Sequence, residues 1–159
     1  MVDDARFEDG AEKPLRLKAQ DSEDLVAISA VLQDAVLPVS EMQFQAGEQR
    51  FGLLANRFRW EDVDAAAASK RAVERVQAVV VFDSVLKVRS SGLDLKDKEQ
   101  VISVLSMTFE AGEDGAGTVV LTLAGDGAIA LDVECVEVTL ADVTRPYIAP
   151  SGKVPSHPA

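Results

Sequence analysis

From residue 39 onward, hydrophobic residues recur mostly at alternate positions, and this alternation constrains the fold more than any other feature of the sequence. A period of two is typical of β-strands, because successive side chains point to opposite faces of a sheet. The segments between the alternating stretches are short and rich in glycine, as in "GEDGAG" and "AGDG". Strands joined in this way pair antiparallel, so the sequence predicts an antiparallel meander sheet of about seven or eight strands. Such a sheet either stays open or curls into a half or full barrel.

The segment before the alternating region predicts a helix. "PLRLKAQ" alternates like a short strand, and "DSEDLVAISAVLQDAVLP" then takes up helical spacing. Asp21 can cap this helix, the acidic first turn suits the helix dipole, and Pro38 ends it. One N-terminal helix packed on a sheet makes the predicted fold class α+β. The apolar face of the helix consists of Leu25, Ile28, Leu32 and Val36.

The length of the chain favours one domain. It has 159 residues, of which 47% are hydrophobic, enough for one core. The predicted globular domain covers residues 14–148. Residues 1–13 and the proline-rich residues 149–159 hold few apolar groups and are expected to be flexible tails. Within the domain, residues 62–74 ("DVDAAAASKRAVE") are low in complexity and are predicted to be a mobile loop, with a short helix as the alternative.

The charge and composition exclude several classes of partner. Lys and Arg number 16 against 27 Asp and Glu, which gives a net charge of -11, so a nucleic acid would be repelled. No apolar run approaches the ~20 residues that cross a bilayer, and the acidic N-terminal residues do not resemble a signal peptide. The single cysteine cannot form an intramolecular disulfide, which favours a reducing compartment. These features predict a cytoplasmic protein with no nucleic-acid or membrane partner.

Two breaks in the alternation bear on strand boundaries. "RFGLLANRFRWE" begins with Phe51 and Leu53 inward and then changes parity. This change predicts a hairpin with a bulge near Leu53, formed with the preceding "VSEMQFQA". "VQAVVVFDSVLKVRSSGL" is interrupted at Asp83 and Ser84, which indicates two strands or one bent strand.

Three carboxylates surround the only cysteine, Cys135, in "GAIALDVECVEVTLADV". One change of phase at Cys135, of the kind that a β-bulge makes, turns Asp132, Glu134 and Glu137 to solvent and the thiol into the core. This interpretation makes the stretch one strand of a hairpin. The alternative is that Asp132 and Glu134, neighbours on one face, bind a metal or act as acid and base.

No pattern predicts catalysis or a cofactor. A cysteine nucleophile normally needs a base, and the only histidine, His157, lies in the C-terminal tail. The glycine-rich segments have neither the spacing of a phosphate-binding loop nor its position between a strand and a helix. We therefore expect no catalytic residues, no metal and no cofactor, and we favour a non-enzymatic role.

The segment "NRFRWE" is the best candidate for a binding site. It brings two arginines of one parity and a tryptophan together in an acidic protein. The functional interpretation is a basic stripe for an anionic ligand or a partner protein. The structural interpretation is that Trp60 belongs to the core and that the arginines pair with acids on adjacent strands. The predicted ligand-binding residues are Asn56, Arg57, Trp60 and Asp83.

Four patterns, some of them discussed above, occur in this order along the chain: "NRFRWE" (56–61), "FDSVLKV" (82–88), "GTVVLT" (117–122) and "LDVECVEVTLADV" (131–143). Together they resemble a family of small uncharacterised alphaproteobacterial proteins that is classed as a domain of unknown function. The resemblance covers most of residues 14–145. It implies a bacterial protein and brings no activity, cofactor or catalytic residue.

These observations favour a domain that acts through protein-protein contacts, as a homodimer or with another protein, because open sheet edges and faces need covering. The alternative is a small-ligand binding module in which a curled sheet holds a pocket near Trp60 and Arg57. The predicted lining of that pocket is Phe44, Phe58, Trp60 and Met107, with Arg57 or Asn56 at its mouth.

Overall fold

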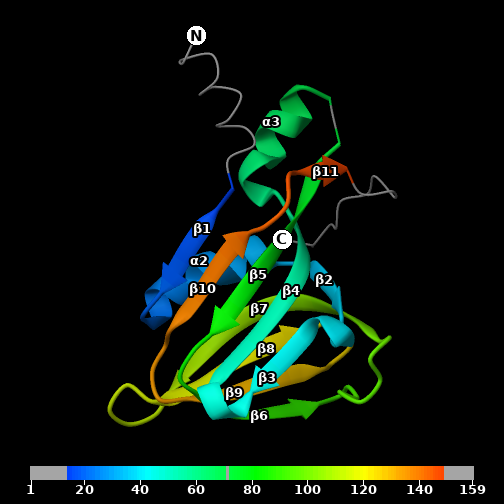
Figure 1. Ribbon diagram of the computed structural model, residues 1–159. Coiled ribbons are helices and arrows are strands. Elements are labelled where there is room, and N and C mark those ends of the chain that lie inside the picture. The colour runs from blue at the N-terminus through cyan, green and yellow to red at the C-terminus, as the bar shows by residue number, and fades with distance from the viewer. Residues whose placement is uncertain (1–13, 71, 149–159) are drawn as a thin grey trace.

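Antiparallel strands make up most of the fold, and one long helix packs against them (Figure 1). A computed structural model provides the structure and describes residues 14–70 and 72–148, so both predicted tails lie outside the described residues. No helix in this part of the chain is long and apolar enough to cross a membrane. The helical elements are α2 (Ser22–Leu32), α3 (Val63–Ala68) and the 3₁₀ turns η1 (Val39–Glu41), η2 (Ala46–Glu48) and η3 (Trp60–Asp62). The strands are β1 (Arg16–Ala19), β2 (Ala35–Pro38), β3 (Met42–Gln45), β4 (Arg50–Phe58), β5 (Glu74–Phe82), β6 (Val85–Ser91), β7 (Val101–Ala111), β8 (Gly117–Leu123), β9 (Ala128–Val133), β10 (Val138–Asp142) and β11 (Tyr147–Ile148).

The strand pairings are antiparallel, as predicted, but the strand order is not that of one meander. The path runs β1-β10-β5-β4-β2-β7-β8-β9-β6, while β3 adds to β4 and β11 to β5. Two meanders, β3-β4-β5 and β7-β8-β9, are therefore joined through β2. The sheet has 11 strands, more than predicted, because it includes short strands that carry little alternation. β1 and β6 lie at the two ends of this path. In the part of the chain that the structure describes they do not pair with each other, so the sheet is not closed into a barrel.

The sheet is weakly joined where β2 meets β4, through the single residue pair Val36 and Asn56. This junction divides it into a front half (β1, β10, β5, β4 and β3) and a back half (β2, β7, β8, β9 and β6). Figure 1 shows β7, β8 and β9 behind β10, β5 and β4. Inward side chains of both halves form one core, whose fully buried members include Val80, Phe82, Leu121, Ile129, Leu131 and Leu140.

The helix α2 covers the core beside β1 and β7. The Asp21 side chain accepts a hydrogen bond from the Asp24 backbone N–H at 2.7 Å, so the predicted N-cap is confirmed. The apolar face is also confirmed for three of its predicted members, which are at most 1% exposed: Leu25, Ile28 and Leu32.

The end of α2 differs from the prediction, because the helix stops at Leu32 and not before Pro38. Asp34 has a φ of 65°, in the left-handed region, which a continuing helix does not allow. Its backbone N–H donates to the Val104 carbonyl at 2.7 Å, and the chain enters β2 there. Val36 is therefore a strand residue.

The predicted hairpin of β3 and β4 is present, but the predicted bulge near Leu53 is wrong. The register of β4 with β3 and β5 is continuous. Phe51, Leu53 and Ala55 point inward, and Arg57 takes the next inward position. The hydrophobic alternation breaks in this strand because a charged residue, Arg57, occupies an inward position.

The stretch 127–143 contains two strands and not one. β9 ends at Val133, and residues 134–137 carry the chain from the back half to β10, which lies between β1 and β5 in the front half. Leu131 and Val133 are buried, as predicted. The prediction of a buried thiol is wrong: Cys135 is exposed, because it lies in the connection between the halves.

Residues 62–74 contain a short helix, the alternative to the predicted loop. η3 leads directly into α3, so the fold has more than the one predicted helix. Ala66 is completely buried, which its sequence pattern did not reveal. The mobility of residues 62–74 stays a prediction.

Candidate functional site

Arg57, the centre of the predicted site, is fully buried and bound to the protein on all sides. Its Nε and Nη2 donate to the two carboxylate oxygens of Asp142 at 2.9 and 2.7 Å. Nη1 and Nη2 donate to the carboxylate of Glu61 at 2.9 Å each, and Nη1 also donates to the Phe58 carbonyl at 2.9 Å. These bonds use every N–H that a guanidinium has. The geometry leaves Arg57 no donor for a ligand.

The electrostatics of Arg57 fit a structural cation. Burial lowers its pKa, but the hydrogen bonds and negative charges of Glu61 and Asp142 outweigh burial and raise the pKa above its usual value. Asp142 also accepts a hydrogen bond from the Leu15 backbone N–H at 2.8 Å. Arg57 therefore ties β4 to η3, to β10 and to the residue before β1.

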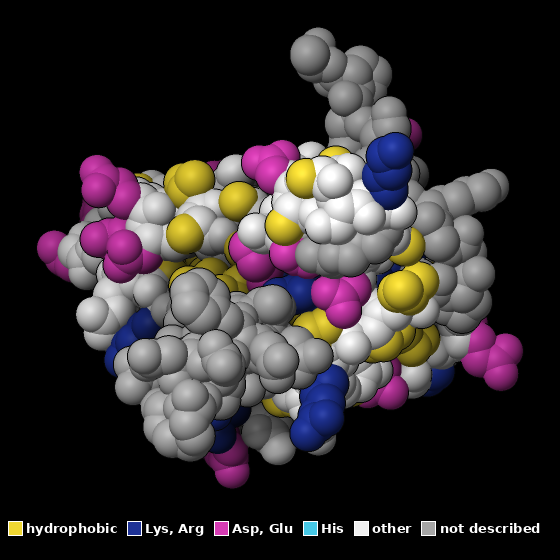
Figure 2. Space-filling model, turned by 90° about the horizontal axis from the view of Figure 1, so that it is seen from above, with side chains coloured by type: hydrophobic (Ala, Val, Ile, Leu, Met, Phe, Trp, Pro, Cys, Tyr) yellow, Lys and Arg dark blue, Asp and Glu magenta, His cyan; other side chains and the backbone are white. Residues whose placement is uncertain are grey.

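Arg59, two residues after Arg57, is also buried and paired with acids. It is 5% exposed, and its Nη1 donates to Glu74 on the adjacent strand β5 at 2.6 Å and to Asp62 at 3.4 Å. Both arginines thus pair with acids, as the structural interpretation expects, but only Glu74 lies on an adjacent strand, because β5 separates β4 from the β10 that carries Asp142. Trp60 is half-buried and does not belong to the core, and the predicted basic stripe is not formed. Figure 2, which looks onto the α3 end of the molecule, shows acidic side chains near the Lys and Arg side chains on this face.

Trp60 and Asn56 lie near Arg57 and also have protein partners. The Trp60 Nε1–H donates to the Gln33 carbonyl at 2.9 Å, and its ring centroid lies 5.4 Å from that of Phe58. The Asn56 Oδ1 accepts from the Tyr147 hydroxyl at 2.6 Å. The structure thus brings Asn56, Arg57 and Trp60 close together. Their polar groups bind other parts of the protein, and these bonds join neighbouring elements.

Asp83, the fourth predicted site residue, lies apart from the others. Asn56 pairs with Gln77 in the middle of β5, whereas Asp83 follows the end of that strand, about 20 Å further along at ~3.3 Å per residue. Asp83 accepts from the Arg50 Nε at 2.9 Å. No single site can therefore contain all four predicted residues.

The carboxylates near Cys135 are engaged separately. Asp132 accepts from Arg89 on the neighbouring strand β6 at 2.6 and 3.2 Å, and this hydrogen bond lowers the pKa of Asp132. Glu137 accepts from the Ser84 hydroxyl at 3.4 Å. Among residues 14–70 and 72–148, no three His, Cys, Asp or Glu side chains come together as a metal site.

An apolar hollow lies elsewhere, at the gap between β3 and β6, which we call the seam. β3 pairs only with β4 and β6 only with β9 among the described strands. At one end of the seam the Val85 N–H donates to the Gln49 carbonyl at 2.8 Å. Between the strands lies a cavity of about 310 Å³, the seam cavity. It is lined by Val39, Met42, Gln43, Phe44, Phe51, Val88, Leu95, Lys98 and Ile129.

The far end of the seam is spanned by residues 92–100, which we call the strap. Its carbonyls at Lys98 and Gln100 accept from the N–H groups of Ser40 and Val39 at 3.1 and 2.8 Å. Leu95 packs against the core, while Lys98 is exposed. No sequence signal shows that a turn residue will border a cavity formed by two distant strand edges.

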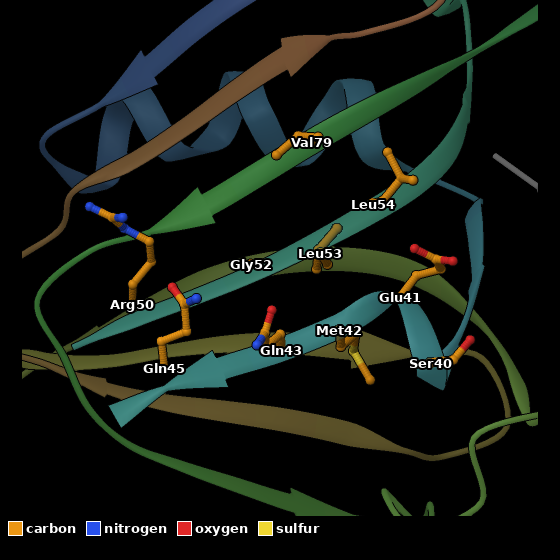
Figure 3. Close-up of a pocket in the computed structure, with 10 residues that line it drawn as sticks. All are labelled: Ser40, Glu41, Met42, Gln43, Gln45, Arg50, Gly52, Leu53, Leu54 and Val79. Carbon is orange, nitrogen blue, oxygen red and sulfur yellow. The ribbon is translucent and has the colours of Figure 1, made fainter. Parts of the chain in front are cut away.

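A second hollow lies on the opposite side of β3 and opens onto the outer face of the front half (Figure 3). Its volume is about 240 Å³. Gly52, which has no side chain, lies between Arg50 and Leu54 in its floor (Figure 3). Gln43 and Gln45 add polar walls. This outer groove is more polar than the seam cavity, and the Arg50 that borders it is held by Asp83.

Fold and cavity together define a class of protein: an α+β domain built on an antiparallel sheet that stays open at one seam, above an apolar hollow. A family model described as "Protein of unknown function (DUF2948)" matches residues 15–157, and the chain belongs to that family. The resemblance to a domain of unknown function is thereby confirmed. No curated protein and no solved structure matches the chain.

Proposed function

We propose that this domain binds a small apolar ligand in the seam cavity. The observation that carries the proposal is the lining, in which inward side chains of β3, β4, β6 and β9 enclose about 310 Å³. Natural ligand pockets begin at about 300 Å³ and are mostly apolar with few polar groups. The proposed site is at the seam and not near Trp60 and Arg57, since those residues already have protein partners.

Substitution of Val88 by phenylalanine tests the proposal. Val88 is half-buried on β6 and lines the seam cavity, so the larger ring is expected to take up part of the cavity, leave too little room for 1-octanol and abolish its binding. Val79→Phe is the matched control, because Val79 is a half-buried strand valine that borders the outer groove. Binding is measured from octanol-induced shifts of backbone amide NMR signals.

Retained octanol binding in Val79→Phe together with its loss in Val88→Phe supports the proposal. If octanol moves no signal of residues that line the seam cavity, or binds both variants equally, the proposal is wrong. Native mass spectrometry of protein taken directly from cells complements the titration, because a stoichiometric small ligand would identify the natural occupant.

Self-association is a second candidate function, favoured by exposed apolar side chains near the end of the described chain. Val143, Tyr147 and Ile148 are 54%, 37% and 57% exposed. Apolar side chains gathered in this way are typical of surfaces that contact another protein. We propose a second copy of the chain as the partner, in a bacterial cytoplasm, where a protein with one cysteine needs no disulfide.

Light scattering over a range of concentrations tests self-association. We expect the wild type to be a dimer and Val143→Glu to shift it toward the monomer, because the new charge would be desolvated in the contact. Val26→Glu is the control, since Val26 is 67% exposed on α2, away from β11. A wild type that stays monomeric at every concentration would remove this candidate.

A further inference from the structure

We infer that the ligand of the seam cavity is a small carboxylic acid whose carboxylate pairs with Lys98, an inference that rests on the proposed function. Among the described residues that line the cavity, Lys98 is the only one with an ionisable side chain. The other lining residues are hydrophobic apart from Gln43. A ligand that matches this lining has an apolar body and one anionic end. Lys98 belongs to the strap, so the anionic end would lie at the strap end of the seam.

Lys98 differs from the two arginines near the seam, because both arginines are paired with acids. Arg50 is bound to Asp83, and Arg89 on β6 is bound to Asp132. The Lys98 ammonium makes no hydrogen bond or ion pair with any residue that the structure describes, although its backbone carbonyl is held by Ser40. With a net charge of -11, the protein repels small anions on average, so the Lys98 ammonium is the group in the cavity lining that can attract an anionic ligand. It can select for a negative charge at this one place.

The volume of the seam cavity limits the size of the acid. About 310 Å³ corresponds to roughly ten water-sized volumes of ~30 Å³ each. A linear acid of about ten non-hydrogen atoms, such as octanoate, therefore fills it. Affinity is expected to rise about fourfold with each methylene added to a shorter acid and to stop rising near that length, because additional methylenes stay in water.

Titration of the full chain with octanoate, 1-octanol and octylammonium tests the inference. We expect octanoate to bind about fivefold more tightly than octanol, and octylammonium more weakly than both, as for an ion pair near the surface. Lys98→Met is expected to remove the preference for octanoate over octanol. Lys96→Met is the matched control, since Lys96 is an exposed lysine of the strap that does not line the cavity.

The outcomes separate the inference from the function on which it rests. A preference for octanoate that disappears in Lys98→Met and persists in Lys96→Met supports the inference. Equal binding of octanoate and octanol, or a preference that survives in Lys98→Met, overturns the inference and leaves the proposed function intact. If none of the three probes binds, both are wrong.

Discussion

Arg57 has a structural role: it pairs with acids of the protein and does not bind a ligand. It occupies an inward position of β4 and has carboxylate partners on β10 and η3. A buried ion pair gains little over an apolar pair of the same shape, but loss of one partner leaves the other charge buried and uncompensated. The arginine is therefore a cross-link between elements that the chain order separates.

Removal of this cross-link is expected to be costly. In Arg57→Met the Asp142 side chain, only 3% exposed, loses its countercharge, so unfolding free energy should fall by about 3–5 kcal/mol. Arg50→Met removes a 47% exposed arginine that pairs with Asp83 and should cost less than about 1 kcal/mol. Urea denaturation of both variants gives the comparison. Similar costs for the two would contradict a structural role for Arg57.

At the scale of elements, the edge strand β6 depends on β9 for all its described strand pairing. The register between them shifts between Val85 and Lys87, and beyond the shift the Arg89 guanidinium holds Asp132 across the two strands. Lys87 and Arg89 also place charges on an otherwise open edge, which discourages pairing with other chains. The cross-strand ion pair thus secures the strand that forms one wall of the seam cavity.

Acidification is expected to weaken this cross-strand pair. Arg89 lowers the pKa of Asp132 in the folded state, so the pair stabilises the fold above the ordinary pKa of an aspartate and stops doing so as the pH falls through the lowered value. Asp132→Asn should therefore lose less stability than the wild type between pH 7 and about pH 3. Denaturant unfolding at several pH values measures this. Glu134→Gln, on an exposed neighbour, should follow the wild type.

At the scale of the whole molecule, the sequence predicts local structure better than the path between elements. Alternation located β5 and β9, and the cap at Asp21 located the start of α2, because these signals depend on neighbouring residues. The burial of Arg57 could not be predicted, since it depends on Asp142, a residue remote in sequence. Cys135 was misplaced because periodicity alone does not show that a strand ends and crosses to the other half.

The candidate site was predicted less well than the fold for the same physical reason. Phe44 belonged to the predicted pocket and lines the seam cavity, but its neighbours there, Val88 and Ile129, come from strands far along the chain. Lys98 has no motif around it. A cavity bordered by two strand edges and a strap is a property of the assembled sheet, so no local pattern in the sequence can indicate it.

The pairing of β1 with β10 limits the order in which the strands can pair during folding. Arg16 lies opposite Ala141, so β1 finds its only described sheet neighbour in a strand far along the chain. The β7-β8-β9 meander needs only nearby residues and can form as soon as it leaves the ribosome. Until β10 inserts between β1 and β5, the valine-rich edge of β5 has no cover on that side. Insertion of β10 between β1 and β5 is therefore expected to be a late step in the folding of this domain.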